Sequence, residues 1–231
     1  MPASCGSSPV TNGSGRASPG FDSAVATGKG DDGTTGLLYG GERIAKDDPR
    51  AEAYGTIDEA VTALGIARAE LGLKQELDVV PPGLTGIADL VLRLQRELFV
   101  AAAELATNPD AWDRLQDGTT RVSAEMVEGL DSLLRDLEAH VEMPREFVVP
   151  GESRTSAAIE LARTTVRRAE RRAVALRRDG LVPGPHLVPY LNRLADLLWV
   201  LARAVEQAES RRAPPSRPGR RRSSGSRTEE K

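Results

Sequence analysis

The sequence predicts an all-α fold, a five-helix up-and-down bundle preceded by an irregular Gly-rich N-terminal loop. Three observations support this prediction. Only 3% of the residues are aromatic, and Ala, Leu and Arg, which favour helices, are abundant, so the composition disfavours a strand-rich core. Apolar residues recur at helical spacing over five long segments joined by short loops. The sequence shows neither strand–helix–strand alternation nor a solenoid repeat.

The N-terminal loop contains the stretch "GKGDDG", in which Gly28, Gly30 and Gly33 have the spacing of a dinucleotide-binding fingerprint. That fingerprint requires a preceding strand and a surrounding βαβ unit, and the sequence predicts neither. A P-loop is excluded as well, because Gly33 is followed by two threonines instead of Lys-Ser or Lys-Thr. On its own the motif therefore indicates a flexible glycine-rich loop and not an NAD site.

The first three helices are recognised by their apolar faces and their ends. The first stops near Gly72, ahead of a Pro-Pro-Gly stretch. The second places Leu90, Leu94 and Leu98 on one face. Ser123 is predicted to be the N-cap of the third, with acidic residues in the opening turns. These helices are predicted over about residues 50–73, 84–107 and 123–140.

The fourth and fifth helices are predicted over about residues 153–178 and 184–209, after the extended segment "REFVVPGES". The fourth has one apolar seam, from Ile159 to Leu176. The fifth has a leucine stripe that starts at Leu187, and a second stripe about 80° away formed by Val188, Ala195, Trp199 and Ala202. So wide an apolar arc needs more than one neighbour. Either this helix is central in the bundle or it also covers a subunit interface, and we favour the interface.

Charge and composition divide the chain into three parts. Residues 25–210 form the predicted helical domain, and the chain up to residue 210 is acidic. Residues 211–231 include eight basic and two acidic residues and few apolar ones, so we expect a disordered basic tail, solvated instead of bound to nucleic acid or lipid. Residues 1–24 are rich in Ser, Gly, Pro and Thr and are expected to be a disordered extension without the apolar core of a secretory signal.

Several kinds of site and location are disfavoured. No apolar run reaches the length of about 20 residues that spans a membrane. The single cysteine, Cys5, lies in the N-terminal extension, and the two histidines, His140 and His186, are far apart in the sequence. Neither a protein-held metal site nor a histidine-based triad is therefore expected. The sequence predicts a soluble, cytoplasmic protein.

The fourth helix carries the densest charge of the domain, in "RTTVRRAERRAVALRR". On a helical wheel Arg163 and Glu170 border the apolar seam, whereas Arg168 and Arg172 point away from it. One interpretation is a solvated charged face with pairs three and four residues apart. The alternative is a polyphosphate site, because arginines far outnumber acids here and guanidinium groups bind phosphate oxygens in bidentate fashion.

Four further residues each have two interpretations. Lys46 is either a surface lysine or a group that serves the glycine-rich loop just before it. Asp58 adjoins apolar residues and is expected to be partly buried, with Arg163 as a candidate partner. Asn192 is a surface amide or lies on a covered side of the fifth helix, and Phe147 belongs to the core or to a site.

Four motifs, in this order, make the chain resemble one known family. They are "TGKGDDGTTGLLYGGERIAKDDPRAEAYGTIDEA", "EFVVPGES", "RRAERRAV" and "YLNRLADLLWVLAR", and they cover about residues 25–209. The family that they resemble is the propanediol-utilisation type of ATP:cob(I)alamin (corrinoid) adenosyltransferase. Four ordered motifs are far more specific than the glycine pattern alone.

The resemblance implies a transferase that moves the 5′-deoxyadenosyl group of ATP to the cobalt of reduced cob(I)alamin and releases triphosphate. It implies a homotrimer with active sites between subunits, ATP and cobalamin as substrates, and Mg²⁺ bridging the phosphates. It also points to two partners, a reductase that supplies Co(I) and an adenosylcobalamin-dependent mutase that receives the product. Because Co(I) is a strong nucleophile that needs no general base, the missing histidine triad is then expected.

The resemblance also implies roles for individual residues. Phe147 matches an aromatic residue at the corrinoid site, and Asp58 and Arg163 match a pair that is salt-bridged between subunits. With Arg167, that pair makes up the candidate catalytic residues. The implied ATP-binding residues are Thr27, Gly28, Lys29, Gly30, Asp31, Gly33, Thr34, Thr35, Lys46, Arg167, Arg168, Glu170, Arg171 and Asn192. Lys29 and Asp32 almost exchange the charges usual in the family, so the contacts of these two residues with ATP are left open.

Two other functions are kept as alternatives. A non-catalytic helical scaffold with a polyanion-binding arginine cluster would not bind ATP at the glycine-rich loop, and it leaves the four motifs unexplained. A cofactor-delivery chaperone, which hands adenosylcobalamin to a mutase, is compatible with catalysis.

Overall fold

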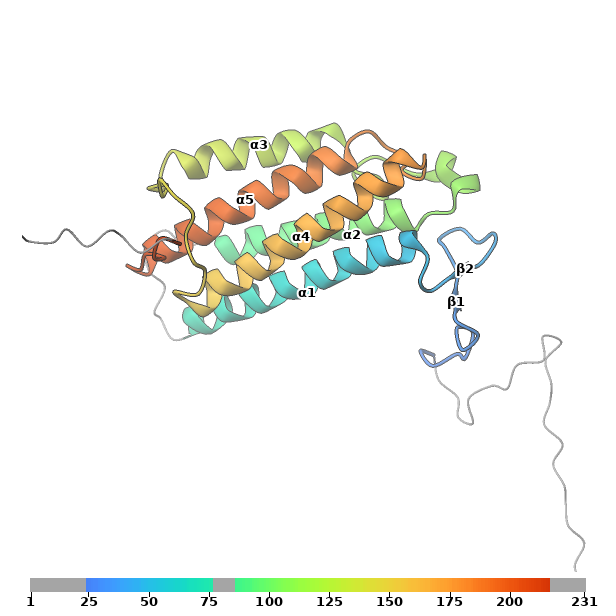
Figure 1. Ribbon diagram of the computed structural model, residues 1–231, viewed down its shortest axis with the longest axis horizontal. Coiled ribbons are helices and arrows are strands. Elements are labelled where there is room, and N and C mark those ends of the chain that lie inside the picture. Colours follow the sequence, from blue (N-terminus) through green and yellow to red (C-terminus); the bar gives the residue numbers. More distant parts are fainter. Residues whose placement is uncertain (1–23, 77–85, 217–231) are drawn as a thin grey trace, which may run out of the picture.

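The computed structural model describes residues 24–76 and 86–216, and every structural statement below concerns these residues. They form a bundle of five helices in which each helix runs opposite to the one before it in the chain, with a small two-stranded sheet at one end (Figure 1). The predicted all-α, up-and-down architecture is confirmed. The elements are β1 (Thr34–Thr35), β2 (Ile44–Ala45), α1 (Pro49–Glu76), α2 (Ile87–Ala106), the 3₁₀ helix η1 (Pro109–Arg114), α3 (Ala124–Glu138), α4 (Arg154–Arg178) and α5 (Leu187–Ala208).

Local signals in the sequence set the helix ends. The Ser123 hydroxyl caps α3 by accepting a hydrogen bond from the Met126 N–H. At the start of α4, Ser153 and Ser156 form a reciprocal capping box. Because these signals are local, the predicted bounds of all five helices agree with the structure to within a few residues.

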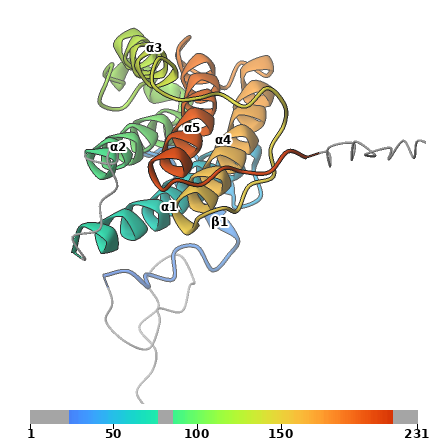
Figure 2. The ribbon, with the colours of Figure 1, turned by 90° about the vertical axis from the view of Figure 1, so that its left-hand side faces the viewer.

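The core lies along α5, which packs between α3 and α4 (Figure 2), while α1 packs against α2 and α4. The leucine stripe of α5 is buried, and so are Ala195 and Ala202 of its second apolar stripe, which are 2% and 0% exposed. Helices of the same chain therefore cover much of the wide apolar arc of α5. Val188 and Trp199 of the second stripe are only partly buried, so a subunit interface over α5 stays a prediction.

A buried carboxylate closes one end of the bundle. Glu104 near the end of α2 is fully buried and accepts hydrogen bonds from the N–H groups of Val122, at 2.8 Å, and Gly184, at 3.0 Å. Burial raises the pKa of Glu104 to about 7, against the opposing effect of these two N–H donors. A Cβ atom at Gly184 would lie only 2.6 Å from the carboxylate. Glu104 thus ties α2 to the segments that lead into α3 and α5.

Some expectations fall on residues outside the described ranges. Cys5, nearly all of the predicted N-terminal extension and residues 217–231 of the predicted tail lie there. None of the helices in the described ranges is long and apolar enough to cross a membrane.

Candidate functional site

The glycine-rich loop leads into the small β-sheet and lies beyond the end of the bundle, beside the start of α1 (Figure 1). Gly28 and Gly33 adopt positive φ angles of 68° and 77°, which glycine tolerates best. The Lys46 N–H donates to the Gly33 carbonyl at 2.8 Å. A Cβ atom at Gly30 would lie 3.0 Å from the Lys46 ammonium nitrogen. The structure therefore brings together the loop and the lysine that the sequence proposed as its companion.

Arg43 organises this loop, a role that sequence reasoning missed. Its guanidinium donates to the carbonyl oxygens of Lys29 and Thr34, each at 2.9 Å, and to the Thr34 hydroxyl at 2.7 Å. Asp32 accepts from the Thr34 hydroxyl at 2.8 Å, so its carboxylate serves the fold of the loop itself. The signal available in the sequence was an arginine within the first family-like motif, "YGGERIAK".

Phe147 and Arg167 meet at a second place, a cavity of about 540 Å³ between α3, α4, α5 and the segment that precedes α4. Phe147 is 85% exposed, which excludes the core interpretation. Its ring instead forms part of the cavity wall, as does Trp199 of α5. The same lining contains the guanidinium groups of Arg163 and Arg167 on α4, together with the carboxylates of Glu138, Glu160 and Asp196. The cavity therefore has an apolar wall beside a mixed set of charged groups.

A cluster of charged side chains lies beside this cavity, and Glu160 belongs to both. Glu160 of α4 accepts hydrogen bonds from Arg163 at 2.6 Å and contacts Arg203 of α5 at 3.2 Å. Arg203 makes two further bonds to Glu206, at 2.8 and 2.9 Å, and its guanidinium lies over the Trp199 ring. Because two carboxylates face two guanidinium groups, the buried charges are balanced, and loss of one member would leave the others uncompensated.

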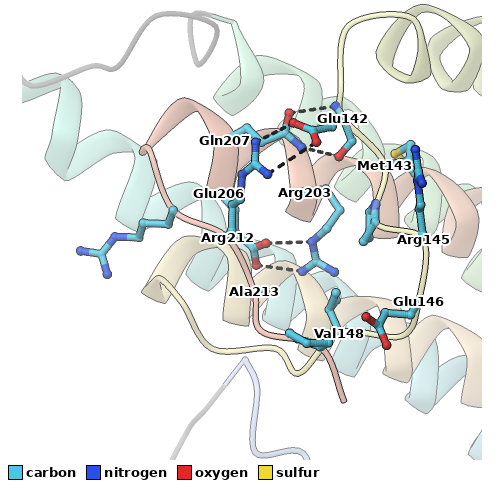
Figure 3. Close-up of a pocket in the computed structure, with 13 residues that line it drawn as sticks. Glu142, Met143, Arg145, Glu146, Val148, Arg203, Glu206, Gln207, Arg212 and Ala213 are labelled. Atoms are coloured by element: carbon cyan, nitrogen blue, oxygen red, sulfur yellow. Dashed lines mark hydrogen bonds and ion pairs between the residues drawn. The ribbon is translucent and has the colours of Figure 1, made fainter. Parts of the chain in front are cut away.

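The chain after α5 turns back and pairs with the Phe147 segment (Figure 3). The Val149 N–H donates to the Pro214 carbonyl at 2.8 Å, and the Ser216 N–H to the Phe147 carbonyl at 2.7 Å. Arg211 donates to the Glu152 carbonyl at 2.6 Å. We call residues 211–216 the C-terminal strap. The chain thus contacts the domain as far as residue 216, and a cavity of about 200 Å³ lies between the strap, α5 and residues 142–148.

Several other charged residues of α4 have partners inside the chain. Arg168 pairs with Glu59 of α1, and Arg172 contacts Glu52 at 3.4 Å. As the helical wheel indicated, these two arginines point away from the apolar seam, and they form partly exposed ion pairs with α1. The Asn192 amide donates to Glu170 at 3.2 Å, so two sequence-predicted site residues, on α4 and α5, do meet.

Asp58 is exposed, which corrects the expectation that it is partly buried. It follows buried Ile57 by one residue, and one residue turns an α-helix by about 100°, so its side chain leaves the core. Asp58 lines a surface hollow between α1 and α4 together with Ile66 and Leu161, which are 50% and 53% exposed. Within the chain the partner of Arg163 is Glu160, not Asp58.

The residues that line the Phe147 cavity come from α3, α4, α5 and residues 147–150, not from the glycine-rich loop. The glycine-rich loop therefore stands apart from the Phe147 cavity, and Asp58 lines a third place, the hollow between α1 and α4. No cluster of three or more His, Cys, Asp or Glu side chains that could hold a metal ion occurs among the residues described.

Comparisons with known proteins identify this combination of loop and bundle. The family model of cobalamin adenosyltransferases matches residues 25–205. A corrinoid adenosyltransferase of Citrobacter freundii is 38% identical over 185 residues, covering 79% of this chain and 94% of its own length. One from Mycobacterium tuberculosis H37Rv is 38% identical over 187 residues, covering 78% of this chain and 88% of its own.

A solved structure has the same fold. It is a phenylalanine-to-histidine variant of a PduO-type ATP:corrinoid adenosyltransferase from Lactobacillus reuteri, complexed with cobalamin and ATP. The two chains superpose with a TM-score of 0.70 at 25% identity, over 84% of this chain and 96% of the other.

Proposed function

The chain belongs to the cobalamin adenosyltransferase family, and we propose that it transfers the 5′-deoxyadenosyl group of ATP to the cobalt of cob(I)alamin. In this reaction Co(I) attacks the 5′ carbon of ATP with its electron pair. A cobalt–carbon bond forms, the bond from the 5′ carbon to the triphosphate oxygen breaks, and triphosphate leaves with that electron pair. Cobalt ends formally as Co(III) in adenosylcobalamin.

The observation that carries this proposal is the cavity that Phe147 and Arg167 share. The exposed Phe147 ring offers an apolar surface to the lower face of the corrin, where it keeps water and the axial base away from the metal. Arg167 supplies a cation beside it that stabilises the charge which develops on the departing triphosphate. The remaining task of the protein is alignment of the 5′ carbon with cobalt, which alone lowers the barrier substantially.

The glycine-rich loop is proposed to bind the triphosphate of ATP. Gly28 and Gly33 have positive φ angles, the space beside Gly33 is open, and the Lys46 ammonium lies against Gly30. We propose that Mg²⁺ enters with ATP, held mainly by phosphate oxygens, because Mg²⁺ commonly binds through phosphates and one or two carboxylates.

Because the loop and the Phe147 cavity are separate in one chain, we propose that the complete site forms between subunits of a homotrimer. The surface around Asp58 supports this. Its exposed Ile66 and Leu161 are apolar side chains that a neighbouring subunit would cover. Asp58 would there meet the Arg163 side of the next chain. Delivery of the product to a mutase stays a proposal that is compatible with catalysis.

One assay tests the function. The protein is mixed with ATP, Mg²⁺ and chemically reduced cobalamin, and adenosylcobalamin formation is followed by absorbance. Turnover equal to a protein-free control would refute the enzyme and favour a scaffold. Arg167→Ala should lose most of the activity, whereas Arg178→Ala, an exposed arginine in the last turn of the same helix, should not. If Arg167→Ala had the kinetics of the wild type, the proposal that Arg167 stabilises the departing triphosphate would be refuted.

A further inference from the structure

We propose that Asn108, at the junction of α2 and η1, is a positioning residue that sets where the glycine-rich loop stands. This inference rests on the proposed function, in which that loop binds ATP. Asn108 is itself 7% exposed, so it would act through the loop instead of touching the substrate.

Asn108 uses three of its polar groups to join two parts of the chain. Its backbone N–H donates to the Leu38 carbonyl at 3.3 Å, and its side-chain amide donates to the Gly40 carbonyl at 2.7 Å. Its side-chain oxygen accepts from the Asp110 N–H at 3.0 Å and so caps η1. The amide is therefore fixed from the helix side while it holds the loop side. Only an amide provides both the donor and the acceptor in this geometry.

The opposing backbone is shaped to receive this side chain. Gly41 has a φ of 91°, and a Cβ atom there would lie 1.7 Å from the Asn108 amide nitrogen. Neighbouring Gly40 also has a positive φ, 80°, but its Cβ position is open, with nothing within 4 Å. Gly41 is thus required by close contact with Asn108 and not by backbone conformation alone.

The held segment leads directly into the nucleotide loop. Leu38 and Gly40 lie in the turn that joins β1 to β2, and its Leu38 N–H also donates to the Ala106 carbonyl at 2.8 Å. β1 and β2 pair Thr35 with Ile44, and Arg43 beside β2 reaches back to Lys29. A displacement of the turn at Gly40 is therefore transmitted through a short, bonded hairpin to Gly30 and Gly33.

Little else fixes this hairpin to η1. A polar hollow of about 420 Å³ lies between them, lined by Glu42, Arg43, Asp48, Arg50, Asn108 and Asp110 among others. Beyond Asn108, Arg114 of η1 lies over the Tyr39 ring, 5.4 Å from its centroid. Exposed contacts of this kind are weak, so the Asn108 side-chain bond is the main contact between the hairpin and η1. On its other side the hairpin is held against α1 by a buried cluster of Leu37, Ile44 and Ala51.

The test compares Asn108→Ala and Asn108→Asp with the wild type in the adenosylation assay. The Ala variant loses the side-chain bond to Gly40, and the Asp variant keeps the η1 cap but places an acceptor against the Gly40 carbonyl. We expect the KM for ATP to rise about three- to tenfold in both variants, from the loss of one buried hydrogen bond. The KM for cobalamin should not change. Unchanged KM for ATP in both variants would overturn the proposal.

Two glycine variants separate the effect of the close contact with Asn108 from the effect of the positive φ angle. Gly41→Ala should raise the KM for ATP more than Gly40→Ala, although both residues have a similar positive φ. In the Asn108→Ala background, Gly41→Ala should cost no more than Gly40→Ala, because the clash partner is then gone and only the strain of a positive φ remains. Additive effects would contradict the pairing. Ser123→Ala is the matched control, since it removes a buried helix cap at the same end of the bundle and should leave the KM for ATP unchanged.

Hydrogen exchange gives a readout that does not depend on activity. The amides of Leu38 and Lys46 should exchange faster in Asn108→Ala than in the wild type, and not in Ser123→Ala. An inactive wild type would refute the proposed function, but faster exchange would still support the structural role of Asn108. An active wild type with unchanged exchange in Asn108→Ala would refute that role alone.

Discussion

Titration of Glu104 should make the stability of this protein depend on pH. Burial raises its pKa from 4.5 to about 7 in the folded chain. The folded state therefore binds the proton more tightly than the unfolded state. The stabilisation is fully present below pH 4.5 and is lost as pH rises through about 7. Since one pKa unit corresponds to about 1.4 kcal/mol, the loss amounts to about 3 kcal/mol at most.

The perturbation is Glu104→Gln, which is neutral at every pH. Glutamine cannot accept from both the Val122 and the Gly184 N–H groups, so the variant starts less stable by about 1–3 kcal/mol. The difference in unfolding free energy between wild type and variant should then shrink as pH rises from 5 to 8. Urea unfolding at fixed chain concentration measures it, and His140 and His186 cancel because both proteins contain them. Parallel pH profiles would refute the reasoning.

Three further predictions concern the proposed site. Phe147→Ala should lower turnover from cob(II)alamin plus a reductant by about tenfold or more, equivalent to about 1.4 kcal/mol. The variant should not have a lower Tm, because the ring is 85% exposed. Turnover equal to that of the wild type would show that Phe147 is not part of the site. A chain that ends at Ser210 lacks the strap and should show a raised KM for cobalamin but not for ATP, whereas one that ends at Ser216 should behave as the full chain. Asp58→Arg should reduce the assembly seen by light scattering from three times the chain mass of 24.7 kDa towards one, and the same change at exposed Asp89 should not.

The helices were predictable because their signals are local. The seam from Ile159 to Leu176 and the cap at Ser123 each lie within a few turns of one helix, and the structure places both as expected. The family, and the activity that it implies, were predictable for a different reason. Four motifs in a fixed order specify a family even when no single motif does.

The sequence could not predict hydrogen bonds and ion pairs between residues that are far apart along the chain. Glu104 appeared as one more helical glutamate, since its donors lie in segments far from it in sequence. The same holds for Arg203, whose buried partner Glu160 is on another helix. Asp58 was misjudged because one residue along a helix separates a buried from an exposed position. Asn108 was not singled out, because its partner Gly40 lies 68 residues away.

The C-terminal strap has a practical consequence for observing the protein. Ser216 is hydrogen-bonded to the backbone of Phe147, so a fluorophore attached at residue 216 would sit at the rim of the proposed corrinoid cavity. Cobalamin absorbs visible light strongly, and a dye this close would be quenched on its arrival. Because Cys5 is the only native cysteine, Ser216→Cys with Cys5→Ser provides a single labelling position. Occupancy of the corrinoid site could then be followed in real time, separately from the chemical step.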